Sequence, residues 1–283
     1  MGSPSQTHMF VAALIIVGGA ALSATTVTQQ GRVALGRVRL VVAPSVAKAN
    51  FLALGDELEA CTAAGCEWLH CSVQDGVFVP KVSFGAPVVS AARKACPDTV
   101  IDVKLGCIDP ENRVAEFAAA GADAISFHPE ATKQPAAVAH KIRDAGVAPG
   151  IVLNPGTAVA SVAPLLGLVD LAVVMLVSPG YGGPKYTELA VEKVKALRAL
   201  RPDLHISVDG GVNEKIAPEF LRAGANVLVA GGAIFKADDK KAVVAELIGN
   251  APHKRGRDIQ AADNNSGPGG AASPFEDDAC PDA

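Results

Sequence analysis

The fold is decided by a phrase that recurs along the chain: AAGCEWLH at residues 63–70, AAGADAISFH at 119–128, DAGVAPGIVL at 144–153 and RAGANVLVAG at 222–231. Each phrase begins as the last turn of an Ala-rich amphipathic helix, and its glycine suits the left-handed position just beyond a helix end. The apolar run that follows lacks a polar face, which is typical of the buried strands of parallel sheets. The phrase therefore predicts a helix followed by a buried parallel strand.

The same alternation extends outward from these phrases to about residues 40 and 250. We predict eight strands, at residues 40–43, 68–73, 100–105, 124–127, 150–153, 171–177, 205–208 and 227–230. Eight βα units in about 210 residues favour an α/β fold, a single-domain (β/α)8 TIM barrel at 40–250, with a doubly wound open sheet as the alternative. In a barrel the functional side chains are expected at the carboxyl ends of the strands.

The composition excludes several classes of partner. The chain has 283 residues, 49% of them hydrophobic and 19% charged, with 25 Lys and Arg against 29 Asp and Glu. The net charge of −4 gives no general attraction for nucleic acid or for an anionic membrane. The six cysteines form no CxxC pair and no Cys/His cluster at metal-binding spacing, so we expect buried thiols rather than disulfides or zinc ligands.

Both ends of the chain differ from its middle. Residues 10–24 form an apolar signal-peptide core that is too short to span a bilayer, and residues 25–39 lack acidic residues but carry arginines, as transit peptides do. We therefore predict a targeting segment at 1–39 and a mature protein in the chloroplast stroma of a plastid, with secretion as the alternative. Residues 251–283, rich in Gly, Pro, Asn and Asp, predict a disordered tail.

Glycines gather after the last three predicted strands. They are Gly180, Gly182 and Gly183 after the sixth strand, Gly210 and Gly211 after the seventh, and Gly231 and Gly232 after the eighth. Exposed backbone amides in these loops form the usual phosphate site of a (β/α)8 barrel, whereas a single glycine pair would indicate only a tight turn. The pattern predicts a phosphorylated ligand.

Motifs at all eight strand ends resemble those of the ribulose-phosphate 3-epimerase family. They are APS at 43–45, WLHCSVQDGVFVPKVSFG at 68–85, IDVKLG at 101–106, FHPEAT at 127–132, VLNPGT at 152–157, MLVSPGYGG at 175–183, VDGGVN at 208–213 and VAGGAIF at 229–235. The resemblance implies a phosphorylated pentose as ligand and the interconversion of D-ribulose 5-phosphate and D-xylulose 5-phosphate, a step of the pentose phosphate pathway and the Calvin cycle. It also implies a homo-oligomer or a partner in an assembly. In the family two Asp residues exchange the proton at C3, and a divalent metal such as Zn, Fe, Mn or Co stabilises the enediolate.

The resemblance places further residues near the substrate. Ser45, His70, Met175 and Asn154 match substrate-binding positions, and His128 matches a position close to them. Each could instead be an ordinary residue of the barrel interior. His205 opens the seventh strand at the opposite end of the barrel, where a structural role is expected.

The chain departs from the family at two positions. The family motif after the second strand is H-x-D-x-M-D-G-x-F-V-P-N, and here Ser72 replaces the Asp that binds metal and transfers a proton. After the third strand the family has D-x-H-x-M, and Lys104 replaces the second metal-binding His. Only His70 and Asp209 remain of the four metal ligands. A divalent ion 4 Å from a lysine would be repelled by roughly 8 kcal/mol at an effective dielectric constant near 20, so we predict no tightly bound metal and no other cofactor.

Three interpretations of the catalytic positions Asp209, Lys104 and Ser72 stay open. The first is a non-catalytic protein that binds sugar phosphate or serves in an assembly, because a serine hydroxyl cannot replace a carboxylate in proton transfer. The second is a metal-free sugar-phosphate enzyme in which Lys104 stabilises an enediolate and Asp209 is the single base. The third is an active ribulose-phosphate 3-epimerase in which Asp75 and an outside ligand rescue the site, although the family's matching Asp belongs to the D-G turn.

A second resemblance bears on the metal-free interpretation. Asp102 and Lys104 match the start of the D-x-K-x-x-D motif of orotidine-phosphate decarboxylase and hexulose-phosphate synthase. The match is incomplete, because Cys107 stands where the last Asp belongs and Asp109 comes two residues late.

Overall fold

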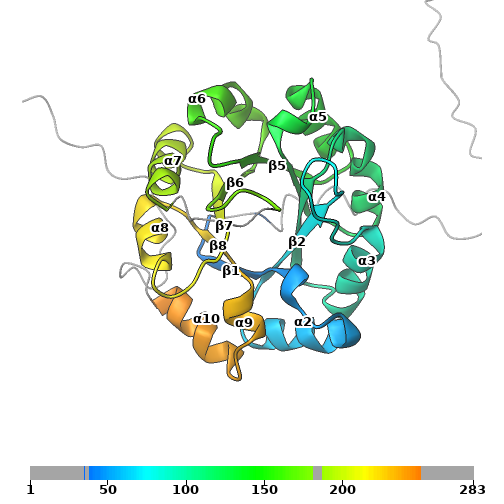
Figure 1. Cartoon of the computed structure of the whole chain (residues 1–283), viewed down its shortest axis with the longest axis vertical. Helices are drawn as coiled ribbons and strands as arrows, with labels where there is room; N and C mark the ends of the chain where they lie inside the picture. Colours follow the sequence, from blue (N-terminus) through cyan, green and yellow to red (C-terminus); the bar gives the residue numbers. More distant parts are fainter. Residues whose placement is uncertain (1–34, 36–37, 181–186, 250–283) are drawn as a thin grey trace, which may run out of the picture.

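The computed structural model describes residues 35, 38–180 and 187–249. Eight parallel strands form one sheet in the order β1-β8-β7-β6-β5-β4-β3-β2, and a parallel bridge between Ser45 and His70 joins its first and last strands. The sheet therefore curls into a nearly closed barrel, as Figure 1 shows. The strands are β1 (Val41–Pro44), β2 (Trp68–Gln74), β3 (Val100–Gly106), β4 (Ala124–Phe127), β5 (Ala148–Leu153), β6 (Leu171–Met175), β7 (His205–Asp209) and β8 (Val227–Ala230).

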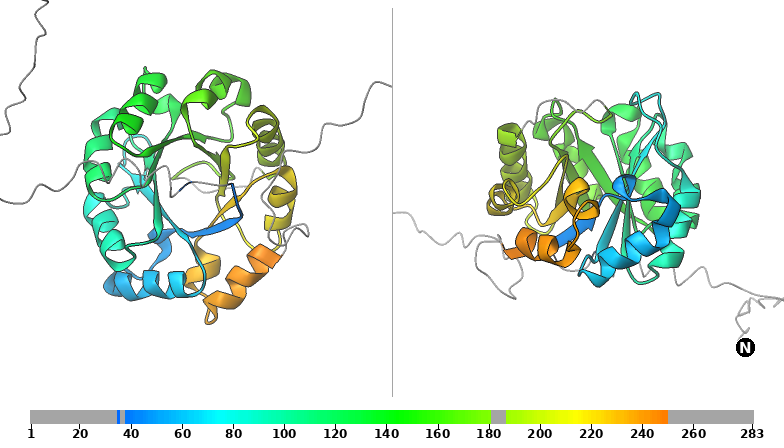
Figure 2. Two further views of the ribbon diagram at one scale, coloured as in Figure 1. Left: turned by 180° about the vertical axis from the view of Figure 1, so that it is seen from behind. Right: turned by 60° about the horizontal axis from the view of Figure 1, so that its bottom comes forward.

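Helices surround the barrel on all sides (Figures 1 and 2). The α-helices are α2 (Leu54–Ala63), α3 (Ala86–Ala95), α4 (Val114–Ala119), α5 (Pro135–Asp144), α6 (Val159–Val162), α7 (Thr187–Leu200), α8 (Ala217–Ala223), α9 (Gly232–Phe235) and α10 (Lys240–Gly249). Short 3-10 helices are η1 (Val46–Lys48), η2 (Phe51–Ala53), η3 (Pro110–Asn112), η4 (Pro129–Ala131) and η5 (Ala163–Leu168). The repeated βα units confirm the predicted single-domain TIM barrel.

The recurring phrase has the predicted local structure. Its four glycines, Gly65, Gly121, Gly146 and Gly224, have φ angles of 100°, 100°, 80° and 110°, respectively. A residue with a side chain would be strained in this left-handed region, so glycine allows the chain to leave each helix and enter the next strand. Two strand ends differ from the prediction: β5 begins earlier because Pro149 pairs with Ile125, and β6 ends earlier, at Met175.

Strand side chains divide between two hydrophobic clusters because they alternate across the sheet. The outer cluster packs the sheet against the helices, and the inner cluster fills the barrel. At the amino-terminal end of the strands, the inner cluster contains Trp68, whose ring lies 5.5 Å from that of His205. His205 contacts the carbonyl oxygen of Leu35, and Leu35 is buried in the same cluster although it falls within the predicted targeting segment.

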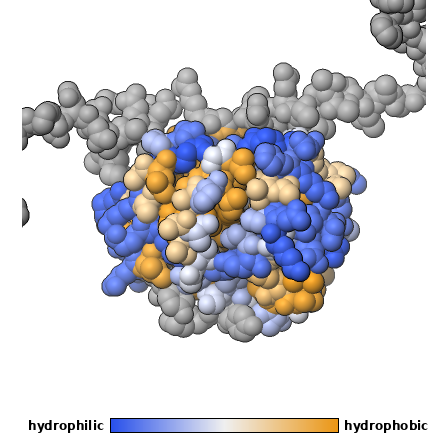
Figure 3. Space-filling model, turned by 90° about the horizontal axis from the view of Figure 1, so that it is seen from above, coloured by the Kyte–Doolittle hydropathy of each residue, from blue (hydrophilic) through white to orange (hydrophobic). Residues whose placement is uncertain are grey.

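The predicted signal core at 10–24, most of the transit-like segment and the predicted tail lie outside the described residues. Within the described ranges, the structure contains no helix long and apolar enough to cross a membrane. Figure 3 shows a barrel surface on which hydrophilic side chains surround separate hydrophobic patches. The five cysteines that the structure describes, Cys61, Cys66, Cys71, Cys96 and Cys107, are free and buried, as predicted.

Candidate functional site

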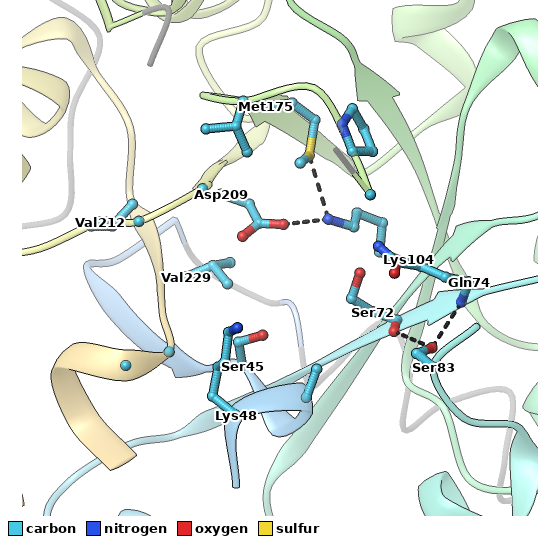
Figure 4. Close-up of a pocket in the computed structure, with 18 of the residues that line it drawn as sticks. Ser45, Lys48, Ser72, Gln74, Ser83, Lys104, Met175, Asp209, Val212 and Val229 are labelled. Carbon is cyan, nitrogen blue, oxygen red and sulfur yellow. Dashed lines mark hydrogen bonds and ion pairs between the residues drawn. The ribbon is translucent and has the colours of Figure 1, made fainter. Parts of the chain in front are cut away.

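A cavity of about 890 Å³ opens at the carboxyl ends of the strands. The residues that line it come from β1, β2, β3, β6, β7 and β8 and from the loops that follow them, and Figure 4 shows their side chains converging. Many of the predicted site residues line this cavity: Ser45, Ser72, Lys104, Met175, Gly180, Asp209, Gly210, Gly211, Gly231 and Gly232. The structure therefore brings together residues that are widely separated in the sequence.

Strand register places the chemically important side chains next to one another. Parallel pairing sets His70 beside Asp102 and Ser72 beside Lys104, and it sets Met175 beside Asp209. Because side chains alternate along a strand, residues 70 and 72 share the inward direction of Trp68, which belongs to the inner cluster. The upper part of the barrel interior is consequently polar.

Lys104 and Asp209 form an ion pair at the bottom of the cavity. The ammonium of Lys104 contacts a carboxylate oxygen of Asp209 and lies 3.4 Å from the Met175 sulfur (Figure 4). The Lys104 side chain is only 4% exposed, and the Asp209 side chain is 15% exposed. Burial alone would raise the pKa of Asp209, but the positive charge of Lys104 holds it below the usual range. Asp209 is therefore a carboxylate at neutral pH.

His70 extends this ion pair into the barrel wall. Its Nδ1 lies 2.7 Å from an oxygen of Asp102, and its Nε2 lies 3.6 Å from an oxygen of Asp209. Both His70 and Asp102 are completely buried. The order of contacts is thus Asp102, His70, Asp209 and Lys104, and His70 lies behind the cavity wall rather than on its surface.

His128 lies near the same cluster, at the end of β4. Its ring is 4.9 Å from that of Phe78. Burial, with a further contribution from the charge of Lys104, lowers the pKa of His128 to about 3. His128 is therefore neutral near pH 7. It adds no positive charge to the cluster around Asp209.

The residues around Asp209 do not fit a divalent metal. The Asp209 carboxylate is in contact with an ammonium, and His70 already holds Asp102 through one ring nitrogen. Among the residues that the structure describes, there is no group of three or more His, Cys, Asp or Glu side chains arranged to bind a metal ion. We therefore assign no chemical step to a metal at this position.

Hydrogen bonds fix the loop between β2 and α3. Ser83 Oγ donates to the carbonyl oxygen of Ser72, 2.9 Å away, and accepts from the amide of Gln74. One carboxylate oxygen of Asp75 accepts from the amides of Val77 and Phe78, and the other accepts from Ile108. Although burial raises the pKa of Asp75, these hydrogen bonds outweigh it and lower that pKa overall. Asp75 thus holds the loop together.

The glycine turns after β6, β7 and β8 differ in their surroundings. A methyl group added to Gly231 would lie 2.7 Å from Lys48 Cγ, whereas one added to Gly232 would meet no atom within 4 Å. At Gly180, it would lie 2.8 Å from Val79, so the loops after β2 and β6 touch. Gly182 and Gly183 lie outside the described residues.

Sequence reasoning named two residues that do not line the cavity and missed two that do. His70 and Asn154 do not line it, and the Asn154 carbonyl accepts a hydrogen bond of 2.6 Å from Lys193. Lys48 and Lys81 line the cavity but were not predicted. Lys81 replaces the Asn that ends the family's second-strand motif, and Lys48 closely follows β1, so a search of every strand-end loop for cations would have found both.

Barrel architecture, glycine turns after the last strands and a cavity with lysines together define a (β/α)8 barrel with a site suited to an anionic ligand. The Ribulose-phosphate 3 epimerase family matches residues 41–235. "Ribulose-5-phosphate-3-epimerase, chloroplastic" of Arabidopsis thaliana is 41% identical over 206 residues, covering 71% of this chain and 73% of that protein. Ribulose-phosphate 3-epimerase of Bacillus subtilis is 38% identical over 214 residues, covering 74% and 98%. The chain belongs to the ribulose-phosphate 3-epimerase family.

Solved structures show the same fold at low sequence identity. KGPDC from Streptococcus mutans, in a complex with ribose 5-phosphate, has a TM-score of 0.58 at 16% identity, covering 75% of this chain and 96% of that one. 3-Hexulose-6-Phosphate Synthase has a TM-score of 0.56 at 22% identity, covering 76% and 100%. These likenesses extend the fold to barrels of other names.

Proposed function

We propose that this protein binds a phosphorylated pentose or a related sugar phosphate in the cavity and has lost most or all of the metal-dependent epimerase activity of its family. The observation that carries this proposal is the ion pair between Lys104 and Asp209 at the bottom of the cavity. The family resemblance assigns both residues to positions where a metal would bind. An ammonium held there by a carboxylate opposes a divalent cation through direct repulsion.

Proton transfer is weakened as well. Epimerisation at C3 requires one group to remove a proton from one face and another to return a proton to the opposite face. Ser72 lines the cavity, but its hydroxyl is too weak an acid, and its conjugate base too rare, to exchange protons near pH 7. The lowered pKa of Asp209 makes this carboxylate a weaker base. Asp75 is held by three backbone amides, which supports a structural role for it.

Sugar-phosphate binding is supported by the side of the cavity away from Lys104. Gly210, Gly211, Gly231 and Gly232 line it, and Gly232 leaves open space beside its backbone. Family relatives are named for a reaction of ribulose phosphate, which gives the proposed class of ligand. Binding and catalysis thus depend on different strands.

A metal-free enzyme is the second candidate, because Lys104 and Asp209 both line the cavity. In this alternative Asp209 removes the C3 proton of the bound ketose, and the Lys104 ammonium stabilises the negative charge on the enediolate oxygen. The same carboxyl group then returns a proton to the same face. The result is exchange of the C3 hydrogen with solvent without inversion.

The test is a turnover assay of the purified protein on D-ribulose 5-phosphate, with and without added Mn²⁺ or Zn²⁺, in D₂O. We expect binding of the sugar phosphate without metal-stimulated formation of xylulose 5-phosphate. Metal-stimulated turnover on the order of 10 per second, an ordinary enzymatic rate, would contradict the proposal and favour an active epimerase. Deuterium entering C3 without inversion would favour the metal-free enzyme.

We also propose that the mature protein lies in the plastid and assembles with itself or with another chain. The first proposal is supported by the chloroplastic name of the Arabidopsis relative and by the composition of residues 1–39. Amino-terminal sequencing of the protein from its own cells would locate the cleavage site. A start near residue 40 is expected, and a start near residue 24 with the transit-like segment retained would favour secretion. Sedimentation of the same material tests assembly.

A further inference from the structure

The cavity contains a lysine that the proposed function does not yet use. Lys48 is the last residue of η1, which directly follows β1 and Ser45, and it lines the cavity. Lys104, by contrast, is bound to Asp209 at the cavity bottom. Lys48 forms no ion pair with any residue in the described part of the chain, and its side chain is exposed. Its charge is therefore available to a ligand.

The aliphatic stem of Lys48 packs on the turn after β8. A methyl group added to Gly231 would lie 2.7 Å from Lys48 Cγ and 3.4 Å from Ser45 Cβ, so these two side chains border the Gly231 backbone. A methyl group added to Gly232 would meet nothing within 4 Å, and Gly232 lines the cavity. The turn thus has one side covered by Lys48 and Ser45, and one side open to the cavity.

Charge inside the cavity also favours an anion near Lys48. The charged residues that line the described cavity are Lys48, Lys81, Lys104, Asp209 and Glu214. Lys104 and Asp209 neutralise each other, which leaves two lysines against Glu214, a residue with an interaction of its own. Close-up geometry separates the two ends of the site: Lys48 and Ser45 lie together, away from Lys104 and Ser72 (Figure 4).

We infer that Lys48 binds the phosphate group of the sugar phosphate, on the open side of the turn formed by Gly231 and Gly232. This inference rests on the proposed function. Lysine offers a compact charge with three hydrogen-bond donors, and hydrogen bonds between charged partners are among the strongest in proteins. The packed stem directs the ammonium to the turn, whereas Lys81 lies on the β2–α3 loop, where its carbonyl accepts from the Gly76 amide. Lys81 therefore provides a matched control.

Calorimetric titration in metal-free buffer tests the inference with two probes, D-ribulose 5-phosphate and inorganic phosphate. We expect Lys48→Gln to weaken the binding of both probes by about tenfold or more, and Lys48→Arg to retain most of the affinity. Lys81→Gln should change either affinity by less than about threefold, as expected for an exposed charge. Wild-type affinity should also fall more steeply with NaCl concentration than that of Lys48→Gln, because salt screens the lost charge pair.

The outcomes separate this inference from the proposed function. If the wild-type protein binds ribulose 5-phosphate and Lys48→Gln binds it within twofold, or is affected no more than Lys81→Gln, the assignment of Lys48 is wrong and the proposed function stands. If the wild-type protein binds neither probe, the proposed function and the assignment of Lys48 both fail. Urea unfolding of each variant should match that of the wild type, since both lysines are exposed.

Discussion

Two edges of the cavity, the carboxyl ends of β2 and β3 and those of β7 and β8, have diverged to different extents from the family pattern. The first edge has Ser72 and Lys104, where the resemblance places metal ligands. The second edge keeps its glycine turns and the open space beside Gly232. Because each strand of a (β/α)8 barrel ends in a separate loop, the residues for chemistry can change while the residues for phosphate binding remain. Binding and catalysis are therefore separable in this fold.

One contact joins the two edges. Lys104 extends from β3 to Asp209 at the end of β7, and His70 approaches the same carboxylate from β2. A substitution at the first edge thus changes the charge state of the second. Variants that restore, remove or bypass this contact test how far the two edges act independently.

Restoring the first edge should give the largest effect. In Ser72→Asp with Lys104→His, two metal ligands return beside His70 and Asp209. We expect metal-stimulated epimerisation to rise from background towards a rate on the order of 10 per second, as in an ordinary enzyme. The affinity for ribulose 5-phosphate should change little, since the glycine turns are untouched. Ser72→Asn with Lys104→Gln is the matched control and should stay inactive; equal activity of the two double variants would show that the restored ligands are not responsible.

Removing the contact between the edges should have the next largest effect. Lys104→Met leaves the Asp209 carboxylate without its ammonium partner, so the free energy of unfolding at pH 7 should fall by about 3 kcal/mol. The control is Lys195→Met, which breaks the exposed pair with Glu192 and should cost less than about 0.5 kcal/mol. A loss below about 1 kcal/mol for Lys104→Met in urea unfolding would contradict a strong buried pair.

The pH dependence of that loss follows from the lowered pKa of Asp209. A carboxyl whose pKa is lower in the folded protein than its unfolded value of about 3.9 stabilises the fold above the unfolded pKa. This contribution disappears as the pH falls through the folded pKa. The difference in unfolding free energy between wild type and Lys104→Met should therefore be constant from pH 5 to pH 8 and shrink below pH 4.

Blocking the second edge should give the smallest effect and should affect binding alone. In Gly232→Ala the added methyl group enters the open space of the turn, so we expect the affinity for ribulose 5-phosphate to fall by about tenfold. Unfolding should be unchanged or slightly harder, because Ala is favoured over Gly in a helix by up to about 1 kcal/mol. Gly167→Ala is the control, since Gly167 also has free space but does not line the cavity. Equal affinities of the two variants would move the phosphate away from this turn.

The sequence predicts the barrel well because its signals are local. Each strand is an apolar run, and glycines such as Gly121 mark the step from helix to strand. Membership of the cavity is harder to predict, because it depends on how deep each strand end lies. His70 and Ser72 both point inward from β2, yet only Ser72 lines the cavity, since His70 is one step deeper and covered by its neighbours. Lys48 was missed because its role depends on packing against Gly231, which lies at the other end of the barrel sequence.

The claim that an ammonium replaces the metal is tested most directly by equilibrium dialysis of the wild-type protein against Mn²⁺ and Zn²⁺, with and without ribulose 5-phosphate. We expect far less than one ion bound per chain in either condition, and one ion per chain for Ser72→Asp with Lys104→His. One tightly bound ion per wild-type chain, lost in Asp209→Asn, would contradict the claim and would require Lys104 to leave its carboxylate partner.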